Sequence, residues 1–409
     1  MTAAADTLIR DREAEEQPVG FVELFFDLIF VFAITQIAAF MADNVTLVGA
    51  GQTLVLFLAT WWLWINTSWV TNLLDPERAP VRIMMFSMML GGLIYAAVLP
   101  DAFGASGLAF AILYTAMQVG RSVFAQWSLH RSDEPAVARN FAGVAAWHVA
   151  SGVLWIGGGL ADSDTRLGWW AAAALIDLIG PAAGHWLPFL RGHSTRDWDI
   201  SGSHLSERCA LFIIIALGEI IIVLGQTYAA TARDAAATAA VITSFAGCAV
   251  MWWIYFDVGA KRASKRMDET DKPGWLARIA YTYLHIPIVA GLIVTAVSDK
   301  KLLADPLGDA SDALVLTGVL GPALFLVGTM LFKQSTSKNR RIPASHLVGL
   351  GALGLVALAG GSASLAVSPM LIVALANLAL VIVAVYERLS PREPTAHADD
   401  PSVVVEIEG

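Results

Sequence analysis

The sequence predicts an all-α protein that crosses a membrane many times, and three observations support this class. Hydrophobic residues make up 56% of the 409 residues and charged residues only 15%, whereas soluble domains are roughly 25% charged. The mean hydropathy is +0.63. The apolar residues gather in runs of about 20, the length that crosses a bilayer as a helix. A soluble fold of this size could not cover so much apolar surface, so lipid must be the solvent for most of the chain.

We expect twelve transmembrane helices, one for each apolar run. The connections between the runs are short, and several contain Pro, Gly, Asp or Asn, which favour turns. The expected helices cover residues 21–42, 48–73, 81–100, 103–127, 138–160, 167–190, 204–226, 236–259, 277–297, 310–332, 343–366 and 369–387. The polar ends of the chain, 1–17 and 389–409, are expected to be disordered tails. The first of them lacks the charged and apolar regions of a signal peptide.

The positive charges predict how the helices are oriented. If twelve helices alternate in direction, all but four of the 26 Lys and Arg residues fall on the side that holds both termini. The four exceptions are Arg166, Arg233, Lys300 and Lys301. The positive-inside rule then places both termini in the cytoplasm. One omitted or added helix would scramble this distribution, so it also supports the number twelve.

The helices fall into two similar sets of six, over residues 18–191 and 204–388. Four matches occur in the same order in both sets. They pair residues 61–66 with 252–257, residues 174–178 with 374–378, Glu23 with Glu207, and Arg82 with Arg278. Because six is an even number, the two sets would run in the same direction, as parallel repeats of transporters do. We therefore predict a duplicated six-helix unit.

Charged side chains inside the expected spans are the candidate functional residues, because a charge at mid-bilayer costs at least ~2.5–3.5 kcal/mol. One set lies near the cytoplasmic ends of the helices. Within it, Glu23 and Asp27 are four residues apart and so share a helix face. The set forms either a structural network that holds the halves together or a gate whose ion pairs break and re-form. Its members are Glu23, Asp27, Arg121, Glu207, Arg208 and Asp257.

A second set of ionisable residues lies nearer the midplane, at His148, Asp177, Glu219 and His285. Glu219 follows Arg208 by about three helical turns, so the two share a face. Chains of Asp, Glu and His inside membranes serve as proton relays. The alternative is that these side chains are buried, hydrogen-bonded packing contacts.

Several classes of function are excluded or unsupported. The net charge of −9 gives no basic surface for nucleic acid. The two cysteines, Cys209 and Cys248, lie in apolar runs, which excludes a disulfide scaffold or a cysteine zinc site. No common nucleotide-binding, hydrolase or zinc-protease motif occurs. The spacing of the acids and histidines gives no support for a metal site. We expect no metal or cofactor, and the expected partners are membrane lipids and a small solute or ion.

Two stretches of the sequence resemble the bacterial low temperature requirement A (LtrA) family. One is VELFFDLIFVFAITQ at residues 22–36, and the other is HLSER at 204–208 with LFIIIALGE at 211–219. The resemblance extends over about residues 18–388 and implies a multi-spanning protein of the bacterial inner membrane. It adds motif positions to the candidates, which are then Glu23, Asp27, Thr35, Gln36, His204, Glu207, Arg208 and Glu219. Leu211 stands where a counterpart of Asp27 would fall, so we expect the halves to differ in role.

The leading hypothesis is a proton-linked secondary transporter or permease for a small solute. Glu219 and Asp177 would carry the proton, and the cytoplasmic charges would form the gate. One alternative is an intramembrane enzyme that acts on a lipid-like substrate with the same acids and histidines. The other is a sensor or scaffold linked to growth in the cold, which only the family name suggests.

Overall fold

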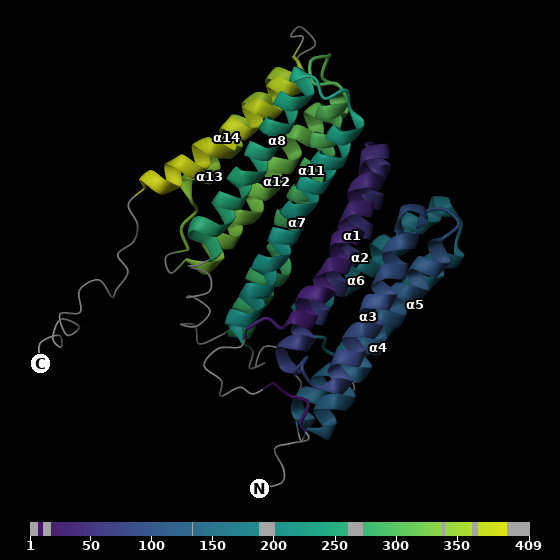
Figure 1. Ribbon diagram of the computed structural model, residues 1–409. Helices are drawn as coiled ribbons and strands as arrows, with labels where there is room; N and C mark the ends of the chain where they lie inside the picture. Colours follow the sequence, from purple (N-terminus) through teal and green to yellow (C-terminus); the bar gives the residue numbers. More distant parts are fainter. Residues whose placement is uncertain are drawn as a thin grey trace, which may run out of the picture.

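The computed structural model describes residues 7–10, 18–132, 134–187, 201–260, 273–337, 340–361 and 367–390. Within these ranges the regular secondary structure is helical, and an isolated bridge joins Ile9 and Leu74. Figure 1 shows two groups of helices standing side by side, α1–α6 and α7–α14. We call the boundary between the two groups the seam. Helices α1 and α7 lie against each other along it.

The helices follow the expected runs closely. The first group contains α1 (Phe21–Asp43), α2 (Leu47–Leu73), α3 (Ala79–Val98), η1 (Leu99–Asp101), α4 (Gly107–Arg131), α5 (Pro135–Leu160) and α6 (Ser163–Ala182). The second contains α7 (Gly202–Ala230), α8 (Ala235–Ile254), η3 (Tyr255–Ala260), α10 (Pro273–Leu276), η4 (Ala277–Tyr283), α11 (His285–Ala304), α12 (Asp312–Thr336), α13 (Ala344–Gly360) and α14 (Pro369–Leu389). The prediction of an all-α polytopic protein is confirmed.

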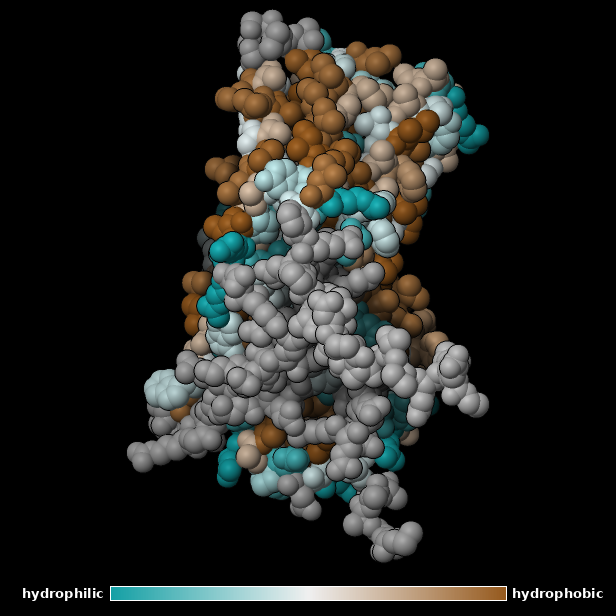
Figure 2. Space-filling view, turned by 90° about the vertical axis from the view of Figure 1, so that its left-hand side faces the viewer, coloured by the Kyte–Doolittle hydropathy of each residue, from teal (hydrophilic) through white to brown (hydrophobic). Residues whose placement is uncertain are grey.

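Ten helical segments in the described ranges are long and apolar enough to cross a membrane. Helices α6 and α13 are not among the ten, and α13 has only 17 residues. Figure 2 shows the face that includes α13 and α14, whose upper part is largely hydrophobic. Leu355 and Leu358 on α13 and Leu378 on α14 are more than half exposed. Such a surface is costly in water and is suited to lipid.

Several helices begin at a side chain that accepts a hydrogen bond from the first turn, which satisfies an otherwise unpaired backbone N–H. Helix α7, for example, begins after Ser201, whose hydroxyl accepts from the backbone of His204 at 3.4 Å. The other capping residues of this kind are Thr46, Asp234, Ser311 and Ser368. The start of α7 is therefore fixed by local chemistry, and this start positions His204 and Arg208.

The segment that leads into α11 is not a regular α-helix. Residues Ala277–Tyr283 form the wider π-helix η4, and α11 begins after it. Pro287 in the first turn of α11 has no N–H to donate to the carbonyl of Tyr283. The ring nitrogen Nδ1 of His285 lies 2.9 Å from the carbonyl of Ala280 and so compensates for part of the irregular hydrogen bonding. Turns of this type are frequent at functional sites.

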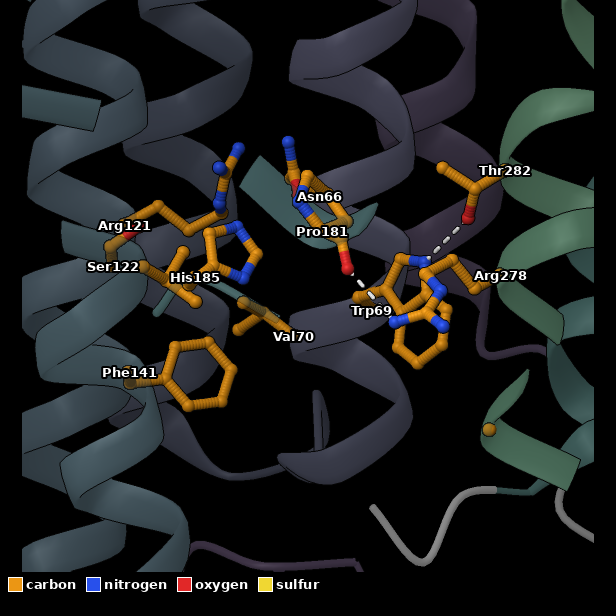
Figure 3. A pocket seen from close by; sticks show the side chains of 12 residues that line it. Asn66, Trp69, Val70, Arg121, Ser122, Phe141, Pro181, His185, Arg278 and Thr282 are labelled. Carbon is orange, nitrogen blue, oxygen red and sulfur yellow. Dashed lines mark hydrogen bonds between the residues drawn. The ribbon is translucent and has the colours of Figure 1, made fainter. Parts of the chain in front are cut away.

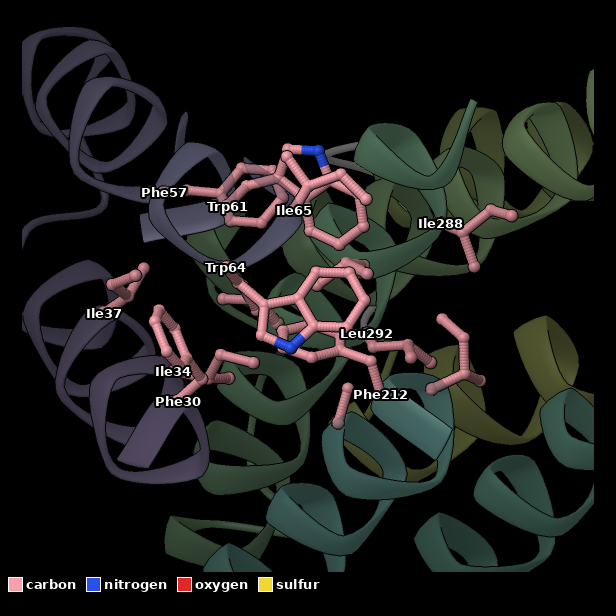
Figure 4. Close-up of a cluster of buried hydrophobic side chains, with 14 of the residues drawn as sticks. Phe30, Ile34, Ile37, Phe57, Trp61, Trp64, Ile65, Phe212, Ile288 and Leu292 are labelled. Carbon is pink, nitrogen blue, oxygen red and sulfur yellow. The ribbon is translucent and has the colours of Figure 1, made fainter. Parts of the chain in front are cut away.

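Apolar packing joins the two groups across the seam. Figure 4 shows Phe30, Ile34 and Trp64 from the first group facing Phe212 from the second. The rings of Trp64 and Phe212 have centroids 4.2 Å apart. The side chains of this cluster are buried. Polar contacts at the seam therefore lie next to a dry core.

Each group also has a corresponding set of packing neighbours. Helix α1 packs against α2 and α3, and α7 packs against α8 and α11. Helix α6 packs against α2, and α14 packs against α8.

Within the second group, α11 and α12 approach each other at glycines. A Cβ added at Gly291 would lie 2.5 Å from the backbone nitrogen of Phe325.

Candidate functional site

An ion pair between Asp27 and Arg208 crosses the seam. Nη2 of Arg208 on α7 lies 2.7 Å from Oδ1 of Asp27 on α1, and both side chains are fully buried. The indole N–H of Trp64 donates to the same Oδ1 at 2.8 Å, and the Arg208 guanidinium lies 5.7 Å from the centroid of that indole ring. Such a pair holds the two helices together, because neither charge can be left alone in a dry interior.

Glu23 is the second buried carboxylate at the seam. Its Oε2 accepts from Nη2 of Arg10 at 2.7 Å and from the backbone N–H of Gly20 at 2.9 Å. Its Oε1 lies 3.1 Å from Nε2 of His204 and 3.7 Å from Nη1 of Arg208. Glu23 is therefore surrounded by donors from three segments of the chain. We call Arg10, Glu23, Asp27, His204 and Arg208 the seam network.

The side chain of Asn72 fixes how His204 meets Glu23. Its Oδ1 accepts from the backbone N–H of Ser201 at 3.1 Å, and its Nδ2 donates to the carbonyl of Ser201 at 2.7 Å. With the amide oriented in this way, Nδ2 faces Nδ1 of His204 at 3.2 Å and donates to it. The ring proton of a neutral His204 then lies on Nε2, which points toward Glu23.

Further along the same two helices, Glu219 on α7 meets Thr35 on α1. The Thr35 hydroxyl lies 2.5 Å from Oε2 of Glu219 and 3.0 Å from the carbonyl of Val31. Glu219 is only 1% exposed. Its Oε1 is buried and has no hydrogen-bond partner among the described residues. Arg208 and Glu219 thus both face α1, at two different levels of the seam. Gln36, the next motif residue, is partly buried.

Asp177 lies in a different place, inside the first group. Its Oδ2 accepts from the hydroxyl of Tyr114 at 2.8 Å and from the indole of Trp155 at 3.0 Å. Gln118 donates to that tyrosine oxygen at 2.9 Å and accepts from Nη2 of Arg121. These side chains form a hydrogen-bonded chain from Arg121 to Asp177. The structure therefore places Arg121 in this chain and not in the seam network.

The remaining candidates are separate from one another. His148 lies 2.9 Å from the hydroxyl of Ser122, and Nε2 of His285 lies 2.8 Å from the hydroxyl of Tyr255. Both histidines are buried.

At the cytoplasmic ends predicted from the charges, Glu207 is exposed and accepts from the backbone of Val19 at 3.3 Å. Asp257 is partly buried and forms no ion pair within the described part of the chain. The candidates thus form several small groups and do not converge on one cavity.

Sequence reasoning missed Arg10 and Asp299. Residues 7–10 fall in the expected polar tail, yet Arg10 also donates from Nε to the carbonyl of Thr71 at 2.7 Å. Asp299 lies beyond the expected ninth span, but α11 continues past it, and Ser244 donates to Asp299 at 2.7 Å. Asp299 follows the buried Ile288 by about three turns and so shares its face. This helical spacing was the signal in the sequence that could have indicated that Asp299 is buried.

The fold and the buried charges between its helices define a polytopic helical membrane protein. The chain belongs to the bacterial low temperature requirement A (LtrA) protein family, whose model matches residues 18–385. It is 39% identical over 385 residues to the uncharacterized protein RA0937 of Rhizobium meliloti (strain 1021). The alignment covers 93% of this chain and 91% of that relative. No solved structure matches the chain. The resemblance noted in the sequence is confirmed.

Proposed function

We propose that this chain is a secondary transporter or permease of the bacterial inner membrane that moves a small solute together with protons. The observation that carries the proposal is the contact between Glu219 and Thr35 across the seam. Glu219 is a buried carboxylate between two helix groups, and one of its oxygens has no hydrogen-bond partner in the described ranges. Such a group is suited to gain and lose a proton as the groups move.

The numbers of hydrogen-bond donors and acceptors around Thr35 support a protonated Glu219. The Thr35 hydroxyl has one proton to donate, but it lies within hydrogen-bond distance of two acceptors, Glu219 Oε2 and the carbonyl of Val31. If Glu219 is ionised, the two acceptors must share the one hydroxyl proton of Thr35. If Glu219 carries a proton and donates it to Thr35, the hydroxyl is free to donate fully to the carbonyl of Val31. Loss of that proton would leave a charge in a dry seam, which favours a rearrangement of α1 against α7.

The seam network supports the role of a gate. Asp27 and Arg208 belong to different helix groups, so any rocking of one group against the other must separate them. Their charges then need new partners or water, because an isolated buried charge is costly. The apolar cluster around Trp64 and Phe212 closes the seam next to this pair. Alternating access by rocking of two repeats uses contacts of this kind.

The same contact supports duplication of a six-helix unit. Thr35 and Glu219 are 184 positions apart, and so are Glu23 and Glu207. The two residues are therefore equivalent under the repeat alignment, and they also touch each other. A residue meets its own counterpart when it lies near a two-fold axis. In parallel repeats that axis runs along the membrane normal, with both termini on the cytoplasmic side and the site between the halves.

Replacement of Glu219 with Gln tests the proposal. In proteoliposomes that contain a trapped pH-sensitive dye, the wild type is expected to couple proton entry to solute movement under an imposed pH gradient. The E219Q protein keeps the shape of the side chain but cannot exchange a proton, so proton-coupled flux should fall at least about tenfold.

The control is Glu77→Gln, because Glu77 is an exposed carboxylate that belongs to none of the candidate sets. That protein should transport like the wild type. The proposal is wrong if E219Q transports as the wild type does for every solute moved, or if the wild type moves neither protons nor solute.

A further inference from the structure

A cavity lies between the two helix groups on the side of the seam network. Its walls border about 550 Å³ of empty space, a figure that includes open solvent at the mouth of the cavity. Figure 3 shows Arg121, Ser122 and His185 on one side of it and Arg278 and Thr282 on the other. The cavity is lined by helices α2, α4 and α5, the end of α6, and the α10–η4 segment. Both groups therefore contribute to its walls.

The polar part of the lining is cationic. Among the twelve described residues that line the cavity, two are arginines, one is a histidine and none is acidic. Arg278 approaches from η4, and its Nη1 donates to the carbonyl of Pro181 at 2.8 Å. The indole N–H of Trp69 donates to Thr282 at 3.0 Å, which connects the walls from the two groups. A cavity with this lining attracts a negative charge.

Arg121 has no partner of opposite charge among the residues that the structure describes. Arg121 is 2% exposed. Its guanidinium donates to three neutral acceptors, which are the carbonyl of Leu63, the hydroxyl of Thr67 and the side-chain oxygen Oε1 of Gln118. No carboxylate lies within ion-pair distance of it in the part of the chain that the structure describes. Its Nε is buried and has no hydrogen-bond partner there. A buried guanidinium of this kind is incomplete without an anion.

The other walls are apolar. Val70, Phe141 and Val144 supply much of the surface, together with the ring of Trp69. Ligand sites commonly combine such walls with a few polar groups that fix the orientation of the ligand. An arginine binds a carboxylate with two parallel hydrogen bonds, while the apolar walls can hold a short hydrocarbon or aromatic part.

We infer that this cavity binds a small organic carboxylate, with its charge toward Arg121 and its apolar part against Phe141 and Val144. The inference rests on the proposed function, because it names the class of solute that the protein moves. In the proposed cycle, entry of the anion supplies the missing partner of Arg121. Asn66, Ser122 and His185 are near enough to the cavity to complete the recognition of the carboxylate.

Equilibrium binding to the purified full chain in detergent tests the inference without requiring transport. The probes are benzoate, its neutral isostere benzamide, and inorganic phosphate, measured by isothermal titration calorimetry. The wild type should bind benzoate at least about tenfold more tightly than benzamide, because only benzoate pairs with the guanidinium. It should also prefer benzoate to phosphate, which has no apolar part.

Two variants locate the site. Arg121→Gln should weaken benzoate binding at least about tenfold, and Val144→Phe should do the same by filling the cavity while leaving Arg121 in place. The control Arg82→Gln removes an exposed arginine outside the cavity and should bind like the wild type. Equal binding of benzoate and benzamide, tighter binding of phosphate, or unchanged binding by either cavity variant would overturn the inference. Binding without flux would contradict the proposed function alone, and flux without binding would contradict this inference alone.

Discussion

Replacement of Arg208 with leucine should lower the free energy of unfolding by about 3–5 kcal/mol, the range measured when one partner of a buried ion pair is removed. The variant leaves the carboxylate of Asp27 in a fully buried position with only the indole of Trp64 to stabilise it. The measurement is unfolding of the purified protein in mixed detergent micelles, followed by circular dichroism.

Two further variants show whether the loss comes from the orphaned charge. Asp27→Asn added to Arg208→Leu removes that charge, so the double variant should be more stable than Arg208→Leu alone. Arg82→Leu breaks an exposed pair with Glu77 and should change stability by no more than about 1 kcal/mol. An Arg208→Leu protein that is as stable as Arg82→Leu would show that the pair at the seam does not hold the two helix groups together.

Replacement of Gly291 with valine should destabilise the protein by about 3 kcal/mol, the upper part of the range for overpacking. The new Cβ would lie 2.5 Å from the backbone nitrogen of Phe325 and 2.7 Å from the carbonyl of Gly321. Backbone atoms cannot rotate away as a flexible side chain can, so α11 and α12 must separate. Small residues allow close approach of helices in membranes. The loss is read from the same unfolding measurement.

Gly351 provides the matched control on α13. No atom lies within 4 Å of a Cβ added there, so Gly351→Ala should be neutral or slightly stabilising, since alanine favours the helix. Gly291→Ala should still destabilise, because its Cβ meets the same backbone atoms. If both alanine variants behave alike, the close approach of α11 and α12 does not limit stability.

The fold could be predicted because hydrophobic length is a strong and local signal. Each expected run contains most of one helix, and boundaries differ mainly where polar side chains continue a helix beyond its apolar part. Helix α11 is the clearest example, since it continues through Asp299 and two lysines to Ala304. The wide turn of η4 could not be predicted from hydropathy, because it depends on how the chain satisfies carbonyls before Pro287. The orientation of the termini and the repeat remain predictions.

The site could be predicted only in part. The free-energy cost of a charge inside the bilayer identifies charged residues that are buried, but it does not identify their partners. It singled out Glu23, Asp27, Arg208 and Glu219, all of which lie at the seam. It also grouped Arg121 with Glu23, Asp27 and Arg208 on depth alone. Depth along a helix does not determine which face a side chain occupies relative to distant helices, and Arg121 turns toward Gln118. Arg10 belongs to a polar segment, for which hydropathy carries no positional information.

In the proposed cycle, the contact between Thr35 and Glu219 would set the number of protons moved for each solute. If the two halves arose by the proposed duplication, one residue type would have faced itself at this position in the ancestor. Two carboxyl groups at this position would have shared their protons, whereas two threonine hydroxyls would have offered no ionisable proton. One hydroxyl and one carboxyl at this junction would supply a single exchangeable proton. The proposed cycle would therefore move one proton through this position for each turnover, and this proton would balance the negative charge of a carboxylate solute.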